Sequence, residues 1–356
     1  MKTTKNIFCM AAAAVVAFAG LTSCSDWTSP ESVDINSPSV SGQFPELYKQ
    51  YLQALRDYKA SDHKVVIGWF DNSASFAGGQ SDRLTALPDS LDAVVLMYPE
   101  LVDQWEADEM HQIQTQKGTK VLYEIDYASM LDDWEETSAG NDTDASGSNA
   151  PETGGNDGFL DYMDACLDRL LPLCAQNGYD GIAVWYDPVN PAHLDEDMKA
   201  LETARQTAFE ARLREWLDAS PDMMFILEGN SMHLLADKSI LDDADFLVVR
   251  TENEEHISAV MTAVRDLAQE GVPADRFIPV ASTTSSSNPS AGYLMLPDGT
   301  SVPAISETAW WVMSQETDIV KAGLGIYQIQ RDYYGNDMDY AMSRAAITIL
   351  NPSFNN

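Results

Sequence analysis

Short apolar runs alternate with longer amphipathic segments along most of this chain. The apolar runs have strand length and are rich in β-branched and aromatic residues, which predicts buried strands at 64–70, 92–99, 119–126, 182–187, 223–228, 245–250, 276–280 and 322–330. Helical spacing between them predicts helices at 47–59, 101–116, 158–177, 201–218, 256–270 and 306–315. Strands separated by helices are typical of a parallel sheet. Because eight strands occur without a glycine-rich dinucleotide fingerprint, the pattern favours a single closed (β/α)8 barrel, an α/β fold, over residues 45–356.

The fourth run is the most distinctive stretch of the chain. An Asn-Gly pair at 177–178 gives the preceding helix a left-handed stop. In the strand that follows, alternation places Ala183, Trp185 and Asp187 on one face and the intervening residues on the other. Asp187 ends the strand, and barrel enzymes keep their chemistry at the carboxyl ends of their strands.

This stretch resembles the D-G-x-D-x-D-x-E signature of glycoside hydrolase family 18, the chitinases and endo-β-N-acetylglucosaminidases, which lies on the fourth strand of a (β/α)8 barrel. The resemblance implies that the last Glu is the general acid. It also implies that the Asp two residues earlier polarises the N-acetyl group of the substrate, which serves as the nucleophile. Asp180 and Gly181 match the signature, whereas Ala183, Trp185 and Asp187 stand where it has Asp, Asp and Glu. Two of the three inward carboxylates are therefore missing, and the third is one methylene group shorter.

These replacements predict little or no turnover by the family mechanism. Substrate-assisted hydrolysis needs an acid within about 2.6–3.2 Å of the leaving oxygen, and a misplacement of about 1 Å by the shorter Asp187 can cost about a hundredfold in rate. Trp185 removes the polarising carboxylate, which adds about 3–4 kcal/mol to the barrier if one lost donor is a guide. Glu124, Asp126 and Glu228 stand near strand ends and are candidates to replace the missing carboxylates.

Aromatic and polar side chains at the expected strand ends are suited to bind a sugar, because sugars present apolar C–H faces that stack on rings. The candidate glycan-binding residues are Trp69, Tyr98, Glu124, Asp126, Trp185, Glu228, Arg250, Tyr327 and Gln328. Further candidates are Tyr127, Asn230, Gln330, Tyr333 and Tyr334. Tyr186 faces the helix layer by alternation, and for every ring core packing is the alternative to ligand contact. Residues 325–330 also resemble the eighth strand of the endo-β-N-acetylglucosaminidase branch, where a Tyr and an amide lie near the sugar.

Composition limits the classes of partner. The net charge of −35 argues against nucleic acid and anionic membrane surfaces, and suits a protein that faces neutral ligands. Cys166 and Cys174 lie on one expected helix, too far apart for a disulfide, so we expect buried thiols. The cysteines and the five histidines show no metal-ligand spacing, and no metal or cofactor is expected.

The first 23 residues are typical of a secretory signal. Positive charge at Lys2 and Lys5 precedes an apolar stretch too short to span a bilayer, and residues 21–24 resemble a bacterial lipobox whose Cys24 is lipidated. Residues 24–44 are expected to be a flexible tether. With the barrel, these features resemble Bacteroidetes lipoproteins of polysaccharide-utilisation loci, which include enzymes and glycan-binding relatives. The resemblance implies an outer-membrane lipoprotein at the cell surface, with glycan-uptake proteins among its partners.

One insertion interrupts the pattern of strands and helices. Residues 132–158 are almost entirely acidic, small and polar, so we expect a disordered loop on the binding face of the barrel. Trp134 within it allows an alternative role as a lid.

The sequence thus predicts a non-catalytic surface lipoprotein that binds N-acetylglucosamine-containing glycans. The first alternative is an active endo-β-N-acetylglucosaminidase with Asp187 as general acid. The second is a scaffold component of a glycan-uptake complex. Exposed rings at the barrel mouth would favour glycan binding without catalysis. Another acid beside Asp187 would favour the enzyme, and a mouth filled by packed side chains would favour the scaffold.

Overall fold

Eight parallel strands close into a barrel. The computed structural model describes residues 40–141, 158–285, 288, 290–334 and 338–352. In spatial order the strands are β1 Val65–Phe70, β10 Gly323–Tyr327, β7 Phe277–Ser282, β6 Phe246–Val249, β5 Met224–Glu228, β4 Gly181–Trp185, β3 Lys120–Asp126 and β2 Ala93–Leu96. All of them lie in the compact unit Tyr51–Asn356. The expected (β/α)8 barrel is therefore confirmed.

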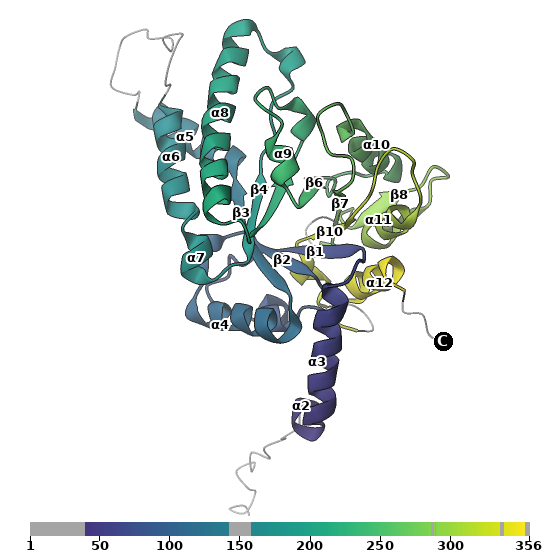
Figure 1. Ribbon diagram of the computed structural model, residues 1–356. Coiled ribbons are helices and arrows are strands. Elements are labelled where there is room, and N and C mark those ends of the chain that lie inside the picture. The colour runs from purple at the N-terminus through teal and green to yellow at the C-terminus, as the bar shows by residue number, and fades with distance from the viewer. Residues whose placement is uncertain (1–39, 142–157, 286–287, 289, 335–337, 353–356) are drawn as a thin grey trace, which may run out of the picture. The chain divides into compact units, whose positions relative to one another are not determined.

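Helices surround the strands, as Figure 1 shows. They are α4 Gln104–Gln112, α5 Tyr127–Asn141, α6 Phe159–Leu170, α7 Leu173–Asn177, α8 Glu196–Ala219, α9 Ile240–Asp243, α10 Ile257–Leu267, α11 Ala304–Met313 and α12 Ala341–Leu350. The strands β8 Tyr293–Met295 and β9 Ser301–Pro303 form a separate antiparallel pair. The described residues begin with α2 Val40–Gln43 and α3 Pro45–Lys59. No helix within the described ranges is long and apolar enough to cross a membrane.

Short helical turns occupy several of the connections. They are η1 Gln80–Asp82, η2 Leu84–Ala86, η3 Pro99–Leu101, η4 Ile113–Lys117, η6 Pro191–His193, η7 Ser231–His233 and η8 Ile329–Asp332. Of these, η1 follows β1 and η8 follows β10. Because β1 and β10 are neighbours in the barrel, these two turns belong to the same part of its carboxyl-end rim.

Alternation along each strand divides the core into two parts. The inner part fills the barrel with Ile67, Trp69, Ala93, Val95, Leu122, Ala183, Ile226, Val248, Ile278 and Val280. The outer part packs the opposite strand faces against the helices, and β4 with the residue after it contributes Ile182, Val184 and Tyr186. The predicted alternation of β4 is therefore confirmed for these residues.

The start of β4 requires a glycine and a carboxylate. A Cβ at Gly181 would lie 2.0 Å from the carbonyl oxygen of Met224 in β5. The preceding carboxylate, Asp180, accepts hydrogen bonds from the Val121 amide and from Lys120 Nζ of β3, each at 2.9 Å. Asp180 and Gly181 therefore hold β4 in register between β3 and β5.

Some element boundaries differ from those expected. Pro172, which lacks an amide hydrogen, divides the helix expected at 158–177 into α6 and α7, so Cys166 and Cys174 lie on two helices; both are buried and free, as expected. The last strand ends at Tyr327 rather than at 330, because Gln328 has a left-handed backbone with a φ of 50°. The segment expected as one helix at 101–116 is divided into η3, α4 and η4.

The acidic insertion begins as a helix rather than as a disordered loop. Asp126 stabilises the first turn of α5 by accepting hydrogen bonds from the Ser129 amide at 3.0 Å and hydroxyl at 2.6 Å. Trp134 on α5 packs its ring against Phe159 of α6, with centroids 5.7 Å apart, which joins α5 to α6. Residues 142–157 of the insertion lie outside the described residues, as do the expected signal, Cys24 and the tether up to residue 39. Residues 40–43 of the expected tether form α2.

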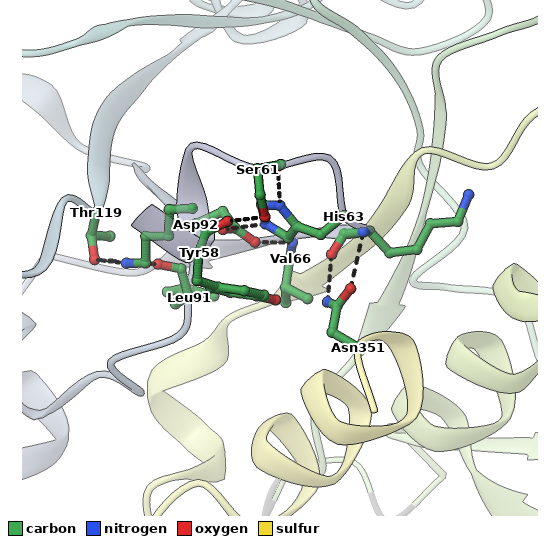
Figure 2. A network of polar contacts seen from close by, with 10 residues as sticks. Tyr58, Ser61, His63, Val66, Leu91, Asp92, Thr119 and Asn351 are labelled. Atoms are coloured by element: carbon green, nitrogen blue, oxygen red, sulfur yellow. Dashed lines mark hydrogen bonds and ion pairs between the residues drawn. The ribbon is translucent and has the colours of Figure 1, made fainter. Parts of the chain in front are cut away.

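A charged network lies at the amino ends of β1 and β2 (Figure 2). The His63 ring nitrogens lie 2.9 Å from Asp92 Oδ1 and 2.7 Å from the Ser61 carbonyl oxygen, and the Val66 amide donates to Asp92 Oδ2 at 2.8 Å. Both ring nitrogens face acceptors, and the hydrogen bond to Asp92 raises the pKa of His63 above its usual value, which favours the charged imidazolium. The network fixes the turn after α3 to the start of β2.

Candidate functional site

Inward side chains from six strands or the turns after them meet at the carboxyl ends of the barrel. They are Trp69, Glu124, Trp185, Glu228, Arg250 and Tyr327. Strand register places Glu124 of β3 opposite Ala183, and Glu228 of β5 opposite Trp185. Parallel strands bring distant parts of the sequence together at this end of a barrel, which is where barrel proteins place their sites. We refer to these six residues as the mouth cluster.

Arg250, which directly follows β6, is the centre of the mouth cluster. Its Nη1 donates to Glu124 Oε1 at 3.0 Å and to Glu228 Oε2 at 2.7 Å. Its Nε donates to Glu252 Oε1 at 2.8 Å. The other oxygen of Glu228 accepts a hydrogen bond from Trp69 Nε1 at 3.0 Å. One guanidinium therefore joins carboxyl groups that come from three strands or their ends.

Two aromatic rings stack on the same guanidinium. The central carbon of Arg250 lies 4.1 Å from the centroid of Trp185 and 5.1 Å from that of Tyr327. A cation over a ring face is attracted by the ring quadrupole, and the attraction reaches about 2 kcal/mol or more where water is excluded. Trp185 and Tyr327 are half-buried, so each ring packs on Arg250 and remains partly open to solvent. The predicted inward direction of Trp185 is therefore confirmed.

Burial controls the charge of the mouth cluster. Desolvation, with the nearby charge of Glu228, raises the pKa of Glu124 to about 8, and desolvation also raises the pKa of Glu228. Burial opposes the charge of Arg250, but Glu228, Glu252 and Glu124 together raise its pKa above the usual range. At neutral pH Glu124 therefore keeps its proton while Arg250 stays charged.

Asp187, the residue aligned with the family's general acid, is exposed and lies beyond the end of β4. Its Oδ1 accepts hydrogen bonds from the Asn230 side chain at 2.6 Å and from the Asn230 amide at 3.1 Å. The two loops approach so closely that a Cβ at Gly229, whose φ is 110°, would lie 2.3 Å from the carbonyl oxygen of Tyr186. Asp187 therefore connects the loop after β4 to the loop after β5.

The remaining predicted residues have different surroundings. Trp69 is 0% exposed and Glu228 is 1% exposed, so they form the floor under the mouth and offer no open face to a ligand. Tyr98, by contrast, is 42% exposed, and Asn72 holds its backbone through hydrogen bonds of 2.8 and 3.0 Å. Asp126 caps α5, as described above. Gln328 lies in the turn that follows β10, where it is half-buried.

Two of the further aromatic candidates belong to the helix layer. Tyr127 packs its ring against those of Tyr186 and Phe209, with centroids 4.7 and 4.8 Å away, and is buried. The sequence correctly assigned Tyr186 to this layer but placed Tyr127 among the candidates. Tyr334 is exposed, whereas Tyr333 packs beside buried Tyr340.

Glu252 and Asn72 are the residues of the mouth that sequence reasoning missed. Glu252 lies two positions after Arg250, so an extension of the strand alternation past the end of β6 would have indicated it. Asn72 carried no such signal, because it lies in the irregular segment after β1. Among the described residues, no group of His, Cys, Asp and Glu is arranged to hold a metal ion.

Several solved structures share this fold. BT1044 superimposes with a TM-score of 0.59 at 18% identity, covering 88% of this chain and 95% of that one. An endo-β-N-acetylglucosaminidase from Cordyceps militaris gives 0.56 at 17% identity, covering 85% and 96%. Human YKL-39, described as a pseudo-chitinase with retained chitooligosaccharide binding properties, gives 0.50 at 11% identity, covering 81% and 99%. At such identities these likenesses show the fold alone, and no curated protein matches the chain.

The family is shown by the sequence as a whole. The family model described as glycoside hydrolase family 18, BT1044-like, matches residues 28–349, which include every strand of the barrel. Asp180 and Gly181, the two residues that match the fourth-strand signature, hold β4 in register between its neighbouring strands. The chain therefore belongs to the BT1044-like group of glycoside hydrolase family 18.

Proposed function

We propose that this protein is a non-catalytic glycan-binding member of family 18, and that its barrel mouth recognises N-acetylglucosamine-containing glycans. The observation that carries the proposal is the stack of Trp185 on Arg250 at the position where the family signature has its polarising Asp. A ring fixed there occupies the space in which a carboxylate would hold the acetamide of the substrate. Ala183, at the first inner position of the signature, is buried and brings no acid of its own.

The other carboxyl groups near the mouth are committed to other contacts. Glu124 and Glu228 accept from Arg250, and Asp187 accepts twice from Asn230. An acid that donates a proton must reach the leaving oxygen at hydrogen-bond distance, and a lost electrostatic contact to the transition state costs about 3–4 kcal/mol. This arrangement favours binding without turnover.

The rings at the mouth supply a surface for a sugar. Trp185 and Tyr327 are held on a buried guanidinium, and Tyr98 lies exposed at the rim. A ring that is already fixed loses little conformational entropy when a ligand stacks on it. We assign glycan contact to these three rings with Gln328 and Asp126 at the edge, and a supporting role to Trp69, Glu124, Glu228 and Arg250. The retained chitooligosaccharide binding of the pseudo-chitinase YKL-39 gives a precedent on the same fold.

The proposal is tested by titrating chitotetraose into the folded protein and measuring the heat of binding. We expect Trp185→Ala to weaken binding by about tenfold or more, since aromatic rings that a ligand covers often supply most of the binding free energy. Trp310→Ala is the matched control, because Trp310 is 60% exposed on α11 and is not part of the mouth cluster, so the affinity should be unchanged. Equal affinities of the two variants would refute the assignment of the site.

One observation favours the alternative of an endo-β-N-acetylglucosaminidase: Asp187 still presents an exposed carboxylate just past β4. Incubation with a chitobiose-core N-glycan separates the two functions. We expect no release of sugar. Release that disappears in Asp187→Ala would establish the enzyme and overturn the binding-only proposal, whereas a folded protein that binds no glycan on a broad array would support the scaffold role.

Attachment to the outer membrane through a lipid on Cys24 is part of the same proposal and depends on the sequence alone. Metabolic labelling with a palmitate analogue should label the protein in its host, and Cys24→Ala should abolish the label. Protection of the protein from external protease in intact cells would contradict the surface location.

A further inference from the structure

A cavity opens at the carboxyl-end rim, where the connections after β1, β7 and β10 come together. It has a volume of about 460 Å³, within the range of ligand sites. Its lining is almost wholly polar and includes one aromatic residue: Ser81, Asp82, Thr284, Ser285, Gln330, Arg331 and Tyr334. None of these residues belongs to the mouth cluster, so the cavity is a separate candidate site.

Hydrogen bonds to neighbouring segments hold η8, which forms one wall of this rim cavity, in place. Asp332, next to Arg331, is buried and accepts hydrogen bonds from the Ser343 amide and hydroxyl, both at 2.7 Å, which fixes η8 to the start of α12. Gln330 Oε1 accepts from the Asp71 amide at 3.3 Å and so joins η8 to the segment after β1. Because the neighbouring Asp332 side chain points into the core, the Arg331 side chain lies on the exposed side of the turn.

The hydroxyl of Tyr334 lies against Gly79, which directly precedes η1. A Cβ at Gly79 would come within 2.7 Å of that oxygen, so a larger residue there would displace the ring. Tyr334 is 73% exposed and therefore presents most of its ring to a ligand. This pairing of an open ring with hydroxyl and amide groups is suited to a pyranose, whose apolar face stacks while its hydroxyls form hydrogen bonds.

Arg331 is unusual among the arginines of this acidic chain. Every other arginine in the described part of the chain donates a side-chain hydrogen bond to a carboxylate, carbonyl or amide oxygen. Arg331 is exposed and makes no such bond to the described residues, although the chain carries a net charge of −35. An unpaired guanidinium on the wall of a cavity is a ready partner for an anion, which it can bind through two parallel hydrogen bonds.

We propose that the rim cavity binds an acidic sugar residue, with its carboxylate or sulfate on Arg331 and its apolar face on Tyr334. Thr284 and Gln330 lie within reach of the ring hydroxyls as cavity-lining residues. The inference extends the proposed glycan-binding function, on which it rests, from neutral N-acetylglucosamine units at the mouth to an acidic unit at the rim.

The cavity also contains one carboxylate, which sets the orientation of the ligand. Asp82 Oδ2 accepts from the amides of Gly78 at 2.8 Å and Gly79 at 3.1 Å, and its Oδ1 accepts from the Ser81 hydroxyl at 3.1 Å. These bonds direct the charge of Asp82 into its own loop. The Asp82 carboxylate is still negatively charged, so it repels an anion from the η1 side of the cavity. The acidic group of a ligand is therefore expected on the side of Arg331.

Calorimetric titration with lactose, 3′-sialyllactose and 3′-sulfated lactose at 150 mM salt tests the inference. We expect one or both acidic probes to bind at least about tenfold more tightly than lactose, since a hydrogen bond to a charged group is stronger than a neutral one. Arg331→Gln should abolish that preference and leave the affinity for lactose unchanged, whereas Tyr334→Ala should weaken all three probes. Arg265→Gln, which removes a different exposed arginine that pairs with Glu316, is the matched control and should keep the preference.

The outcomes separate this inference from the function on which it rests. Equal binding of acidic and neutral probes, or a preference that persists in Arg331→Gln, overturns the rim site. Chitotetraose binding that is lost in Trp185→Ala and intact in Arg331→Gln supports the mouth site independently of that result. If only the sialylated probe binds tightly the anion is a carboxylate, and if both acidic probes do the site accepts any anionic group; both patterns support the inference.

Discussion

Arg250 is the side chain with the most contacts inside the mouth cluster. Its guanidinium contacts the carboxyl groups of Glu124 and Glu228 and the rings of Trp185 and Tyr327. In an enzyme of the family the same region must leave carboxylates free to act on a substrate. Here the carboxyl groups of Glu124 and Glu228 accept hydrogen bonds from Arg250 instead, so these three side chains form one connected cluster.

Removal of the Arg250 charge should be costly. Arg250→Met leaves buried carboxyl groups without their partner, and breaking a buried ion pair in this way costs about 3–5 kcal/mol of unfolding free energy. Urea denaturation at pH 7 measures the loss. Arg265→Met, which breaks the more exposed pair with Glu316, should cost less than about 1 kcal/mol and serves as the control. Equal losses in the two variants would show that the mouth cluster does not stabilise the fold.

Glu124 should make the fold less stable as the pH rises. Its pKa is about 8 in the folded protein against a usual 4.5, so the folded state keeps a proton that the unfolded state releases. The resulting stabilisation is fully present below a pH of about 4.5 and is lost as the pH rises through about 8. In Glu124→Gln the fall in unfolding free energy between pH 5 and 9 should be smaller by about 1 kcal/mol or more, because one pKa unit corresponds to about 1.4 kcal/mol.

Denaturation curves at pH 5, 7 and 9 check this prediction. The raised pKa of His63 gives a fall of the same sign, starting near pH 6.5, so the comparison must be between variant and parent rather than between pH values alone. Glu254→Gln, at an exposed position, is the control and should follow the parent protein. A Glu124→Gln curve parallel to that of the parent would contradict the assigned proton.

At the scale of elements, β4 contains both matched and replaced positions of the family signature. Asp180 and Gly181 make backbone contacts with both neighbouring strands, whereas positions 183, 185 and 187 face the interior or the solvent. The first kind of contact depends on the barrel, which the protein retains. The positions of the second kind carry the family's carboxylates in the signature, and in this chain they are Ala, Trp and Asp.

Two glycines in this stretch should respond differently to the same substitution. Gly181→Ala would place a Cβ 2.0 Å from a backbone oxygen of β5, which forces neighbouring strands apart and should cost more than about 4 kcal/mol or prevent folding. Gly178→Ala has open space around it and only the strain of a φ of 73°, so a loss of about 1–2 kcal/mol is expected. Thermal unfolding of both variants gives the comparison, and similar melting temperatures would be incompatible with a closed β4–β5 contact.

At the scale of the whole molecule, charge is the dominant feature. The chain has 56 acidic and 21 basic residues, and most described arginines are already paired. Excess like charge destabilises a compact state through self-repulsion. Arg331, which makes no side-chain hydrogen bond to the described residues, is a local exception within this excess of negative charge.

Salt should therefore stabilise this protein. Raising sodium chloride from 10 to 150 mM shortens the Debye length from about 30 to about 8 Å and screens the repulsion between exposed acids, while buried pairs such as those of Arg250 are screened less. A rise in melting temperature of a few degrees is expected by calorimetry, with sorbitol of equal osmolality as the control. A fall would mean that surface ion pairs outweigh the net repulsion.

Local pattern was enough to predict the barrel, because strand and helix periods are properties of neighbouring residues. It also assigned the two faces of β4 correctly. It misjudged the end of the last strand, where the left-handed backbone of Gln328 interrupts the expected run. It also misjudged the start of the acidic insertion, which is helical and where Trp134 packs on Phe159. Both errors arise at positions where a contact or a backbone angle overrides the local pattern.

The sequence by itself determined the family, the barrel and the replacement of two signature carboxylates, because each of these follows from the type and order of neighbouring residues. Only the tertiary structure decided which side chains surround Trp185 at the mouth of the barrel. The partners of Arg250 are separated from it by as many as 126 positions, and no local pattern indicates that one cation will meet Glu124, Glu228 and two rings. The closure of the barrel brings them together, because parallel strands end at a common rim.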